Sequence, residues 1–170
     1  AASVAMGGLN LAVCCAGVGW PKRMVGKEGT MPGEFFRKVI EINLIGTLLL
    51  CKEAAAVMQK NAPNAEGERG ALVMTASVAA YDGQVGQVAY AASKGGVVAM
   101  TLPMARELAS SGVRVVTIAP GLFMTPMLAA LPQEARDSLG QQVPFPSRLG
   151  RPAEYAQLVG QIVANPMLNG

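Results

Sequence analysis

The sequence predicts an α/β fold in which helices cover both faces of a parallel sheet. Three short, continuous apolar runs occupy residues 9–17, 71–77 and 113–121, and such runs are typical of strands buried on both faces. Two long helical stretches, residues 32–60 and 87–110, lie between them. Strands that alternate with helices of this length form βαβ units, whose right-handed crossovers make the strands parallel.

The first elements follow from glycine and capping signals. Residues 1–8 have the pattern of a helix end closed by two glycines, and the strand over residues 9–17 follows directly. After a loop, Thr30 is suited to cap the helix over residues 32–60. We expect that helix to break near Asn43.

The later elements are bounded by proline and glycine. A loop over residues 78–86 leads to the helix over residues 87–110, which contains Pro103 and should bend there. The third strand is rich in β-branched residues and stops at a Pro-Gly pair. A long connection rich in Met, Leu, Phe and Pro then precedes a last helix over residues 152–164, whose first residue is a proline.

The composition excludes several classes of protein. A length of 170 residues with 51% hydrophobic and 15% charged residues indicates a globular domain with a buried core. The net charge of +3 comes from scattered Lys and Arg, and only 5% of residues are aromatic, so we expect no nucleic-acid partner. No apolar run reaches the ~18 residues of a membrane span, because Lys52 and Glu53 interrupt LIGTLLLCKEAAAVM. We therefore expect a soluble protein.

The cysteines and the missing histidine restrict the chemistry. The sequence has no histidine, which excludes Ser-His-Asp and Cys-His catalysis and histidine-based metal sites. Its three cysteines, Cys14, Cys15 and Cys51, match neither a disulfide framework nor a zinc-site spacing. We expect buried thiols in a reducing compartment and no metal site. Acid-base chemistry must use another side chain.

Tyr90 and Lys94 stand four residues apart in the helical stretch AYAASKGGVVAM. Positions i and i+4 share one face of a helix, so the phenol and the ammonium group would lie within reach of each other. A free phenol titrates near pH ~10, and a nearby cation favours its ionised form. The pair is thus a candidate acid-base site. The alternative is that Tyr90 fills a half-buried helix face while Lys94 extends past it to water.

Ligands of parallel sheets bind outside the carboxyl ends of the strands. The residues that follow the three predicted strands and carry candidate functions are Gly17, Ser77, Pro120, Gly121 and Thr125. Tyr90 and Lys94 open the helix after the second strand. We expect all of these residues to converge on one edge of the sheet.

Several motifs occur in a fixed order: CCAG at 14–17, NLIGT at 43–47, Ser77 thirteen residues before Tyr90, YAASK at 90–94 and PG at 120–121. Over nearly the whole chain this order resembles the short-chain dehydrogenases/reductases. TASVAAYDGQVGQVAYAASKGG, TIAPGLFMTP and VPFPSRLG are especially similar to the type II 3-hydroxyacyl-CoA dehydrogenases, a branch with hydroxysteroid-oxidising members. The resemblance implies a Rossmann-like doubly wound parallel sheet, of which the chain forms the C-terminal portion of a single domain.

The resemblance also implies an oxidoreductase that transfers a hydride between NAD and a secondary alcohol or ketone, with NADP not excluded. The implied catalytic residues are Asn43, Ser77, Tyr90 and Lys94. Tyr90 would exchange a proton with the substrate oxygen, and Lys94 would also hold the nicotinamide ribose. Ser77 would donate a hydrogen bond to that oxygen, and Asn43 would anchor a water that relays protons. The alternatives are a solvent-facing serine and a helix-breaking asparagine.

The implied cofactor-binding residues are Ala16, Gly17, Tyr90, Lys94, Pro120, Gly121 and Thr125. Thr125 would bind the carboxamide, or it would simply cap a loop. The Met- and Leu-rich residues 122–140 resemble a substrate lid whose apolarity suits an acyl-CoA or a hydroxysteroid, although such residues also form plain core. The long helices resemble those through which family members form homodimers or homotetramers. The expected compartment is the cytoplasm in a bacterium and the mitochondrion in a eukaryote.

Two departures from the family pattern limit these expectations. The glycine-rich phosphate loop and the residue that selects NAD or NADP belong to strands that precede residues 9–17. We therefore expect residues 1–170 to be a partial domain truncated at both ends, with a non-catalytic fragment or interaction module as the alternative. Cys14 stands where the family usually has asparagine, and a thiol is the poorer hydrogen-bonding group.

Overall fold

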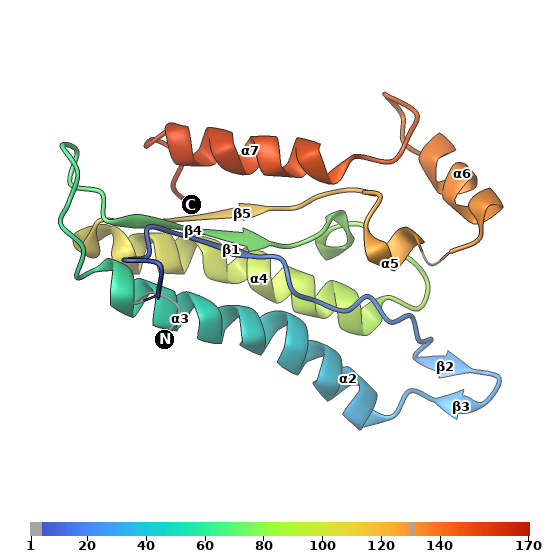
Figure 1. The fold of residues 1–170 in the computed structure, drawn as a ribbon. Helices are drawn as coiled ribbons and strands as arrows, with labels where there is room; N and C mark the ends of the chain where they lie inside the picture. Colours follow the sequence, from blue (N-terminus) through green and yellow to red (C-terminus); the bar gives the residue numbers. More distant parts are fainter. Residues whose placement is uncertain (1–4, 130) are drawn as a thin grey trace. The chain divides into compact units, whose positions relative to one another are not determined.

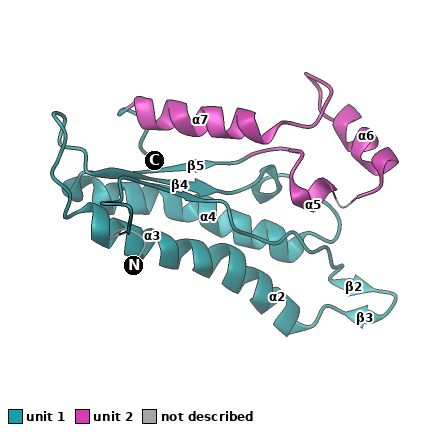
Figure 2. Cartoon of the chain, viewed as in Figure 1, with its two compact units in different colours: residues 1–119, 166–170 teal, residues 120–165 magenta. Residues whose placement is uncertain are grey.

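The computed structural model describes residues 5–129 and 131–170, which divide into two compact units (Figure 2). Unit 1 comprises residues 1–119 and 166–170, and unit 2 comprises residues 120–165. Part of the predicted helix end, residues 1–4, lies outside the described residues. Gly7 and Gly8 have φ angles of 73° and 147°, which suits a closing pair of glycines.

Unit 1 is built on a three-stranded parallel sheet with the order β1-β4-β5 (Figure 1). The strands are β1 (Leu11–Cys14), β4 (Gly70–Thr75) and β5 (Val113–Ile118). Cys14 lies opposite Met74, and Thr75 lies opposite Ile118, so the carboxyl ends of all three strands meet at one edge. The predicted α/β class with a parallel sheet is confirmed.

A long helix with one π-helical segment lies between β1 and β4. It consists of α2 (Gly33–Ile40), a π-helical segment (Glu41–Ile45) and α3 (Gly46–Met58). The predicted break near Asn43 is therefore present, but it is a widened turn and not an interruption. Such π-helical turns occur mostly as single turns within α-helices, often at functional sites.

A short hairpin lies in the region predicted to be a plain loop. β2 (Val25–Gly26) pairs with β3 (Gly29–Thr30) in antiparallel fashion. The prediction that Thr30 caps the following helix is wrong, because Thr30 pairs with Val25 in this hairpin. Pro32 occupies the N-cap position instead, and no side chain caps it. Strands of two residues are too short to show an alternating pattern.

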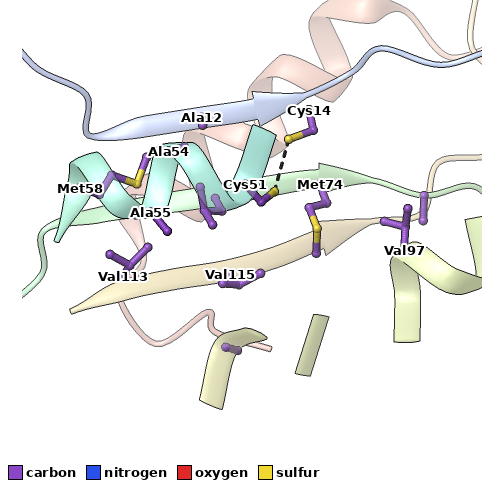
Figure 3. Close-up of a cluster of buried hydrophobic side chains, with 13 residues drawn as sticks. Ala12, Cys14, Cys51, Ala54, Ala55, Met58, Met74, Val97, Val113 and Val115 are labelled. Atoms are coloured by element: carbon purple, nitrogen blue, oxygen red, sulfur yellow. Dashed lines mark hydrogen bonds between the residues drawn. The ribbon is translucent and has the colours of Figure 1, made fainter. Parts of the chain in front are cut away.

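Helix α4 (Val88–Leu108) follows β4 and continues through Pro103. The predicted bend at this proline stays a prediction. Both α3 and α4 pack on the sheet, and Figure 3 shows the buried cluster between them and the strands. Its members include Cys14, Cys51, Met58, Leu72, Met74, Val97, Val113 and Val115. This cluster packs the two helices against the strands.

Unit 2 contains the long connection and the last helix. Its elements are α5 (Pro126–Ala129), α6 (Gln133–Gln141) and α7 (Pro152–Ala164). Pro152 opens α7, as its sequence position indicates. Glu154 in the first turn of α7 accepts two hydrogen bonds from Arg148 and one from the Arg151 N–H. The hydrogen bonds from Arg148 and then from Arg151 lower the pKa of Glu154 to about 2.

Within the described part of the chain, no helix combines the length and the apolar character that crossing a membrane would need. The same residues contain no cluster of three or more His, Cys, Asp or Glu side chains that could hold a metal ion.

Candidate active site

Tyr90 and Lys94 lie one turn apart near the beginning of α4. The Lys94 Nζ atom lies 5.8 Å from the centroid of the Tyr90 ring. Lys94 is only 4% exposed and donates a hydrogen bond of 2.8 Å to the Thr75 carbonyl oxygen at the end of β4. The alternative in which Lys94 extends to water is therefore wrong. Burial lowers the pKa of Lys94, and the electrostatic effect of Cys15 opposes this shift.

Asn43 lies in the π-helical segment and is fully buried. Its Oδ1 atom accepts a hydrogen bond of 2.8 Å from the Val18 N–H, and its Nδ2 atom donates one of 2.9 Å to the Val18 carbonyl. The Thr47 hydroxyl donates to the Asn43 carbonyl oxygen at 2.8 Å. Asn43 thus ties the loop after β1 to the widened helical turn.

Ser93 connects this asparagine to α4, and sequence reasoning missed it. Asn43 Nδ2 donates to the Ser93 Oγ atom at 3.0 Å, and Ser93 Oγ donates to the Tyr90 carbonyl oxygen at 2.7 Å. Ser93 has no exposed surface. A serine inside an otherwise apolar helix was the available signal, since such a hydroxyl often bonds the carbonyl of the preceding turn.

Ser77 lies two residues beyond the end of β4, on the edge where the strands end. It begins a short 3-10 helix, Val78–Ala80, and its Oγ atom accepts a hydrogen bond of 3.1 Å from the Ala79 N–H. Ser77 is buried, so it is not the solvent-facing serine of the alternative. Because its hydroxyl accepts in this contact, the hydroxyl proton stays available for a ligand oxygen.

Ala16 and Gly17 follow β1 and are exposed. A Cβ atom added to Gly17 would lie 3.1 Å from Asn43 Oδ1 and 3.5 Å from Lys94 Nζ. The backbone at Gly17 therefore runs directly over the asparagine and the lysine, and a side chain there would crowd Asn43 and contact Lys94. The structure brings these three predicted residues together.

The cysteines differ in part from the predicted buried thiols. Cys14 and Cys51 are buried, but Cys15 is exposed. The prediction for Cys15 is wrong because Cys14 ends β1 facing the buried cluster, and neighbouring residues of an extended chain point to opposite sides. The Cys15 Sγ atom accepts a hydrogen bond from the Thr75 hydroxyl, at a donor–acceptor distance of 3.7 Å.

Pro120, Gly121 and Thr125 belong to unit 2. The Thr125 N–H donates to the Phe123 carbonyl at 2.8 Å, and the Thr125 carbonyl accepts hydrogen bonds from the N–H groups of Leu128 and Ala129. The Thr125 backbone thus opens α5. The predicted contacts of these three residues with a cofactor stay predictions.

Comparison with known proteins agrees with the sequence motifs. The family profile described as short chain dehydrogenase matches residues 1–136. The chain is 54% identical over 166 residues to 3-hydroxyacyl-CoA dehydrogenase type-2 of Rattus norvegicus and 53% identical to that of Homo sapiens. In both comparisons the match covers 96% of this chain and 64% of the relative.

More distant relatives and a solved structure extend this comparison. Human (3R)-3-hydroxyacyl-CoA dehydrogenase is 35% identical over 150 residues, covering 88% of this chain and 54% of the relative. The crystal structure of 3-hydroxyacyl-CoA dehydrogenase type-2 from Mycobacterium avium superposes with a TM-score of 0.90 at 42% identity. That superposition covers 95% of this chain and 63% of the crystallised chain. The chain spans less than two thirds of the length of these relatives. It belongs to the short-chain dehydrogenase family, as the order of its motifs predicts.

Proposed function

We propose that the whole protein is an NAD-dependent oxidoreductase that interconverts a 3-hydroxyacyl-CoA and its ketone, or a similar apolar secondary alcohol such as a hydroxysteroid. Members of the family use NAD(P), and NADP is the alternative cofactor. The observation that carries the proposal is the buried Lys94 ammonium beside the Tyr90 ring, at the edge where the strands end. The names of the relatives support the substrate class.

Tyr90 is the proposed acid-base group. The chain has no histidine, and of the candidate site residues only Tyr90 combines a dissociable hydroxyl with an adjacent cation. In the oxidation direction the phenolate oxygen takes the proton of the substrate hydroxyl, and in the reduction direction the phenol returns it. A nicotinamide held beside Lys94 would supply the hydride chemistry of the reaction.

Lys94 and Asn43 position this chemistry. The Thr75 carbonyl accepts a hydrogen bond from the Lys94 ammonium group and so holds this cation beside the Tyr90 ring. Gly17 lacks a side chain over the same two residues, so its backbone leaves room for the nicotinamide ribose beside Lys94. Asn43 would hold a water that passes protons to Lys94, while its bonds to Val18 keep the Gly17 loop in place.

Ser77 is the proposed partner of the reacting oxygen. Its hydroxyl oxygen is held by the Ala79 N–H, so the hydroxyl proton can be directed to a substrate oxygen without further rearrangement. Ala16, Pro120, Gly121 and Thr125 are proposed to complete the cofactor site. The exposed Met124, Met127 and Leu131 support an apolar substrate, because they present sulfur and hydrocarbon surface on the segment that resembles the lid.

We also propose that the two units form part of one Rossmann-like domain and that the protein is a homodimer or homotetramer. Exposed apolar side chains on one helix support the oligomer: Leu48, Leu49 and Leu50 of α3 are 41%, 50% and 49% exposed. Large apolar side chains left exposed on a helix are more often explained by a protein–protein interface as their number grows. Light scattering at micromolar concentration should return a multiple of the chain mass, and a monomer would contradict the assembly.

The replacement Tyr90→Phe tests the proposed function in the whole protein. It removes the hydroxyl and keeps the ring, so turnover of a 3-hydroxyacyl-CoA should fall at least about a hundredfold while folding is kept. Tyr81→Phe is the matched control, because Tyr81 is 72% exposed and should leave turnover unchanged. Near-normal turnover of Tyr90→Phe would refute the assignment, and an inactive wild-type protein would favour the non-catalytic alternative.

A further inference from the structure

Two cysteines from separate elements meet in the buried cluster of unit 1. Cys14 ends β1 and Cys51 lies in α3, and their Sγ atoms are 3.6 Å apart. The dashed line in Figure 3 marks the hydrogen bond between them. Cys14 is 5% exposed and Cys51 is fully buried. Neither residue is assigned a part in the proposed reaction.

The surroundings of the pair restrict what it can do. Its neighbours in the cluster include the apolar side chains of Ala12, Ala54, Ala55 and Met74. Among the described residues there is no third His, Cys, Asp or Glu that would complete a metal site with these two sulfurs. A metal centre is thus unsupported, and the chemistry left to the pair is that of two thiols facing each other.

The contact also shifts the pKa values of the two thiols in opposite directions. The hydrogen bond from Cys51 lowers the pKa of Cys14, although burial opposes this effect. The same bond and burial raise the pKa of Cys51. The thiolate is the form that attacks an oxidant. Cys14 is 5% exposed at the end of β1 whereas Cys51 is fully buried, so Cys14 is the sulfur that an oxidant reaches first, and Cys51 is placed to react with the product.

We propose that Cys14 and Cys51 form an oxidisable dithiol, a covalent modification site that closes to an intramolecular disulfide when a hydroperoxide oxidises it. The Sγ atoms must approach from 3.6 Å to about 2.05 Å. The approach of about 1.5 Å can be shared between the side chains of the last residue of β1 and a residue of α3. Residues 15–17 beyond Cys14 are exposed, so local opening at this strand end would admit a small oxidant.

The proposed reaction balances with the hydroperoxide as the only oxidant. With hydrogen peroxide, the Cys14 sulfur attacks one oxygen, the O–O bond breaks, and a sulfenic acid and one water form. The Cys51 sulfur then attacks the Cys14 sulfur, the S–O bond breaks, and a second water leaves. The two thiols lose two electrons and two protons, and the peroxide is reduced. A thiol reductant such as dithiothreitol reverses the change.

Peptide mapping of the native protein after treatment with hydrogen peroxide tests the proposal. Of the three thiols within residues 1–170, those of Cys14 and Cys51 should be oxidised to the disulfide, and that of Cys15 should still react with a thiol reagent. Under non-reducing conditions, trypsin should release the peptide that ends at Lys22 joined to residues 39–52, because cleavage follows Lys22, Lys38 and Lys52. The variant Cys15→Ala is the matched control. It should give the same cross-link, since Cys14 is then the only cysteine within residues 1–22.

The unfolding midpoint gives a second measurement that does not depend on the peptide map. A bond between positions 37 residues apart restricts the unfolded chain, so the urea midpoint should rise on oxidation and return with dithiothreitol. The variant Cys51→Ala should lose this rise. The proposal is overturned if the cross-link involves Cys15, if Cys14 accumulates as a sulfinic acid, or if Cys14 and Cys51 stay reduced while Cys15 is oxidised.

Discussion

Replacing Asn43 by alanine removes the side chain that ties the loop after β1 to the widened helical turn and to α4. The wild-type amide makes three hydrogen bonds, two with the Val18 backbone and one with Ser93. Each bond contributes about 0.5–1.5 kcal/mol net, and a buried group left unpaired costs about 1–3 kcal/mol. The surroundings of Val18 and Ser93, which lose their bonds to Asn43, determine where in this range the loss of unfolding free energy falls.

Two features reduce the expected loss. Val18 is half-buried, so water can reach its N–H and carbonyl groups, and Ser93 keeps its bond to the Tyr90 carbonyl. We therefore expect Asn43→Ala to lower the free energy of unfolding by about 3 kcal/mol. Because the Gly17 loop then loses its tie to the helix, the turnover proposed for the whole protein should also fall about tenfold or more.

A second asparagine provides the control. Asn61 donates hydrogen bonds of 2.8 Å and 2.9 Å to the carbonyls of Leu9 and Arg69, and it has no part in the candidate site. Urea unfolding and steady-state turnover should be measured for both alanine variants. Asn61→Ala should lose stability alone. A loss below about 1 kcal/mol for Asn43→Ala, or equal losses of turnover in the two variants, would refute the reasoning.

Two further predictions concern pH. Burial lowers the pKa of Lys94 below its ordinary value of 10.5, so the unfolded chain holds this proton to higher pH than the folded chain. The buried charge therefore costs stability at neutral pH, and the wild type should gain stability relative to Lys94→Met as the pH rises towards 10.5. For Glu154, whose pKa falls from 4.5 to about 2, the stabilising effect is complete above pH 4.5 and disappears as the pH falls through 2. Glu154→Gln should thus be less stable than the wild type at neutral pH and equally stable near pH 2, as chemical unfolding at a series of pH values would show.

Continuous apolar runs located the three strands of the sheet, because burial on both faces leaves few polar positions. Spacing along one helix located the Tyr90–Lys94 pair for a similar reason, since the neighbours of a helical residue are fixed by local geometry. The hairpin of β2 and β3 and the exposure of Cys15 escaped prediction. Both depend on where a chain leaves a regular element, which short periodic patterns do not define.

The contact between Cys14 and Cys51 depends on a longer-range feature, the widened turn at Glu41–Ile45. Between Val39 and Cys51, the buried positions of this helix are Val39, Asn43, Thr47 and Cys51, which repeat every four residues. In a regular α-helix each residue turns by about 100°, so three repeats of four would rotate Cys51 about 120° away from the face of Val39. A π-helical turn holds about one extra residue, which offsets roughly 100° of this rotation. Asn43 and Cys51 can therefore both face the sheet, so the turn that directs Asn43 to Val18 also brings Cys51 to Cys14.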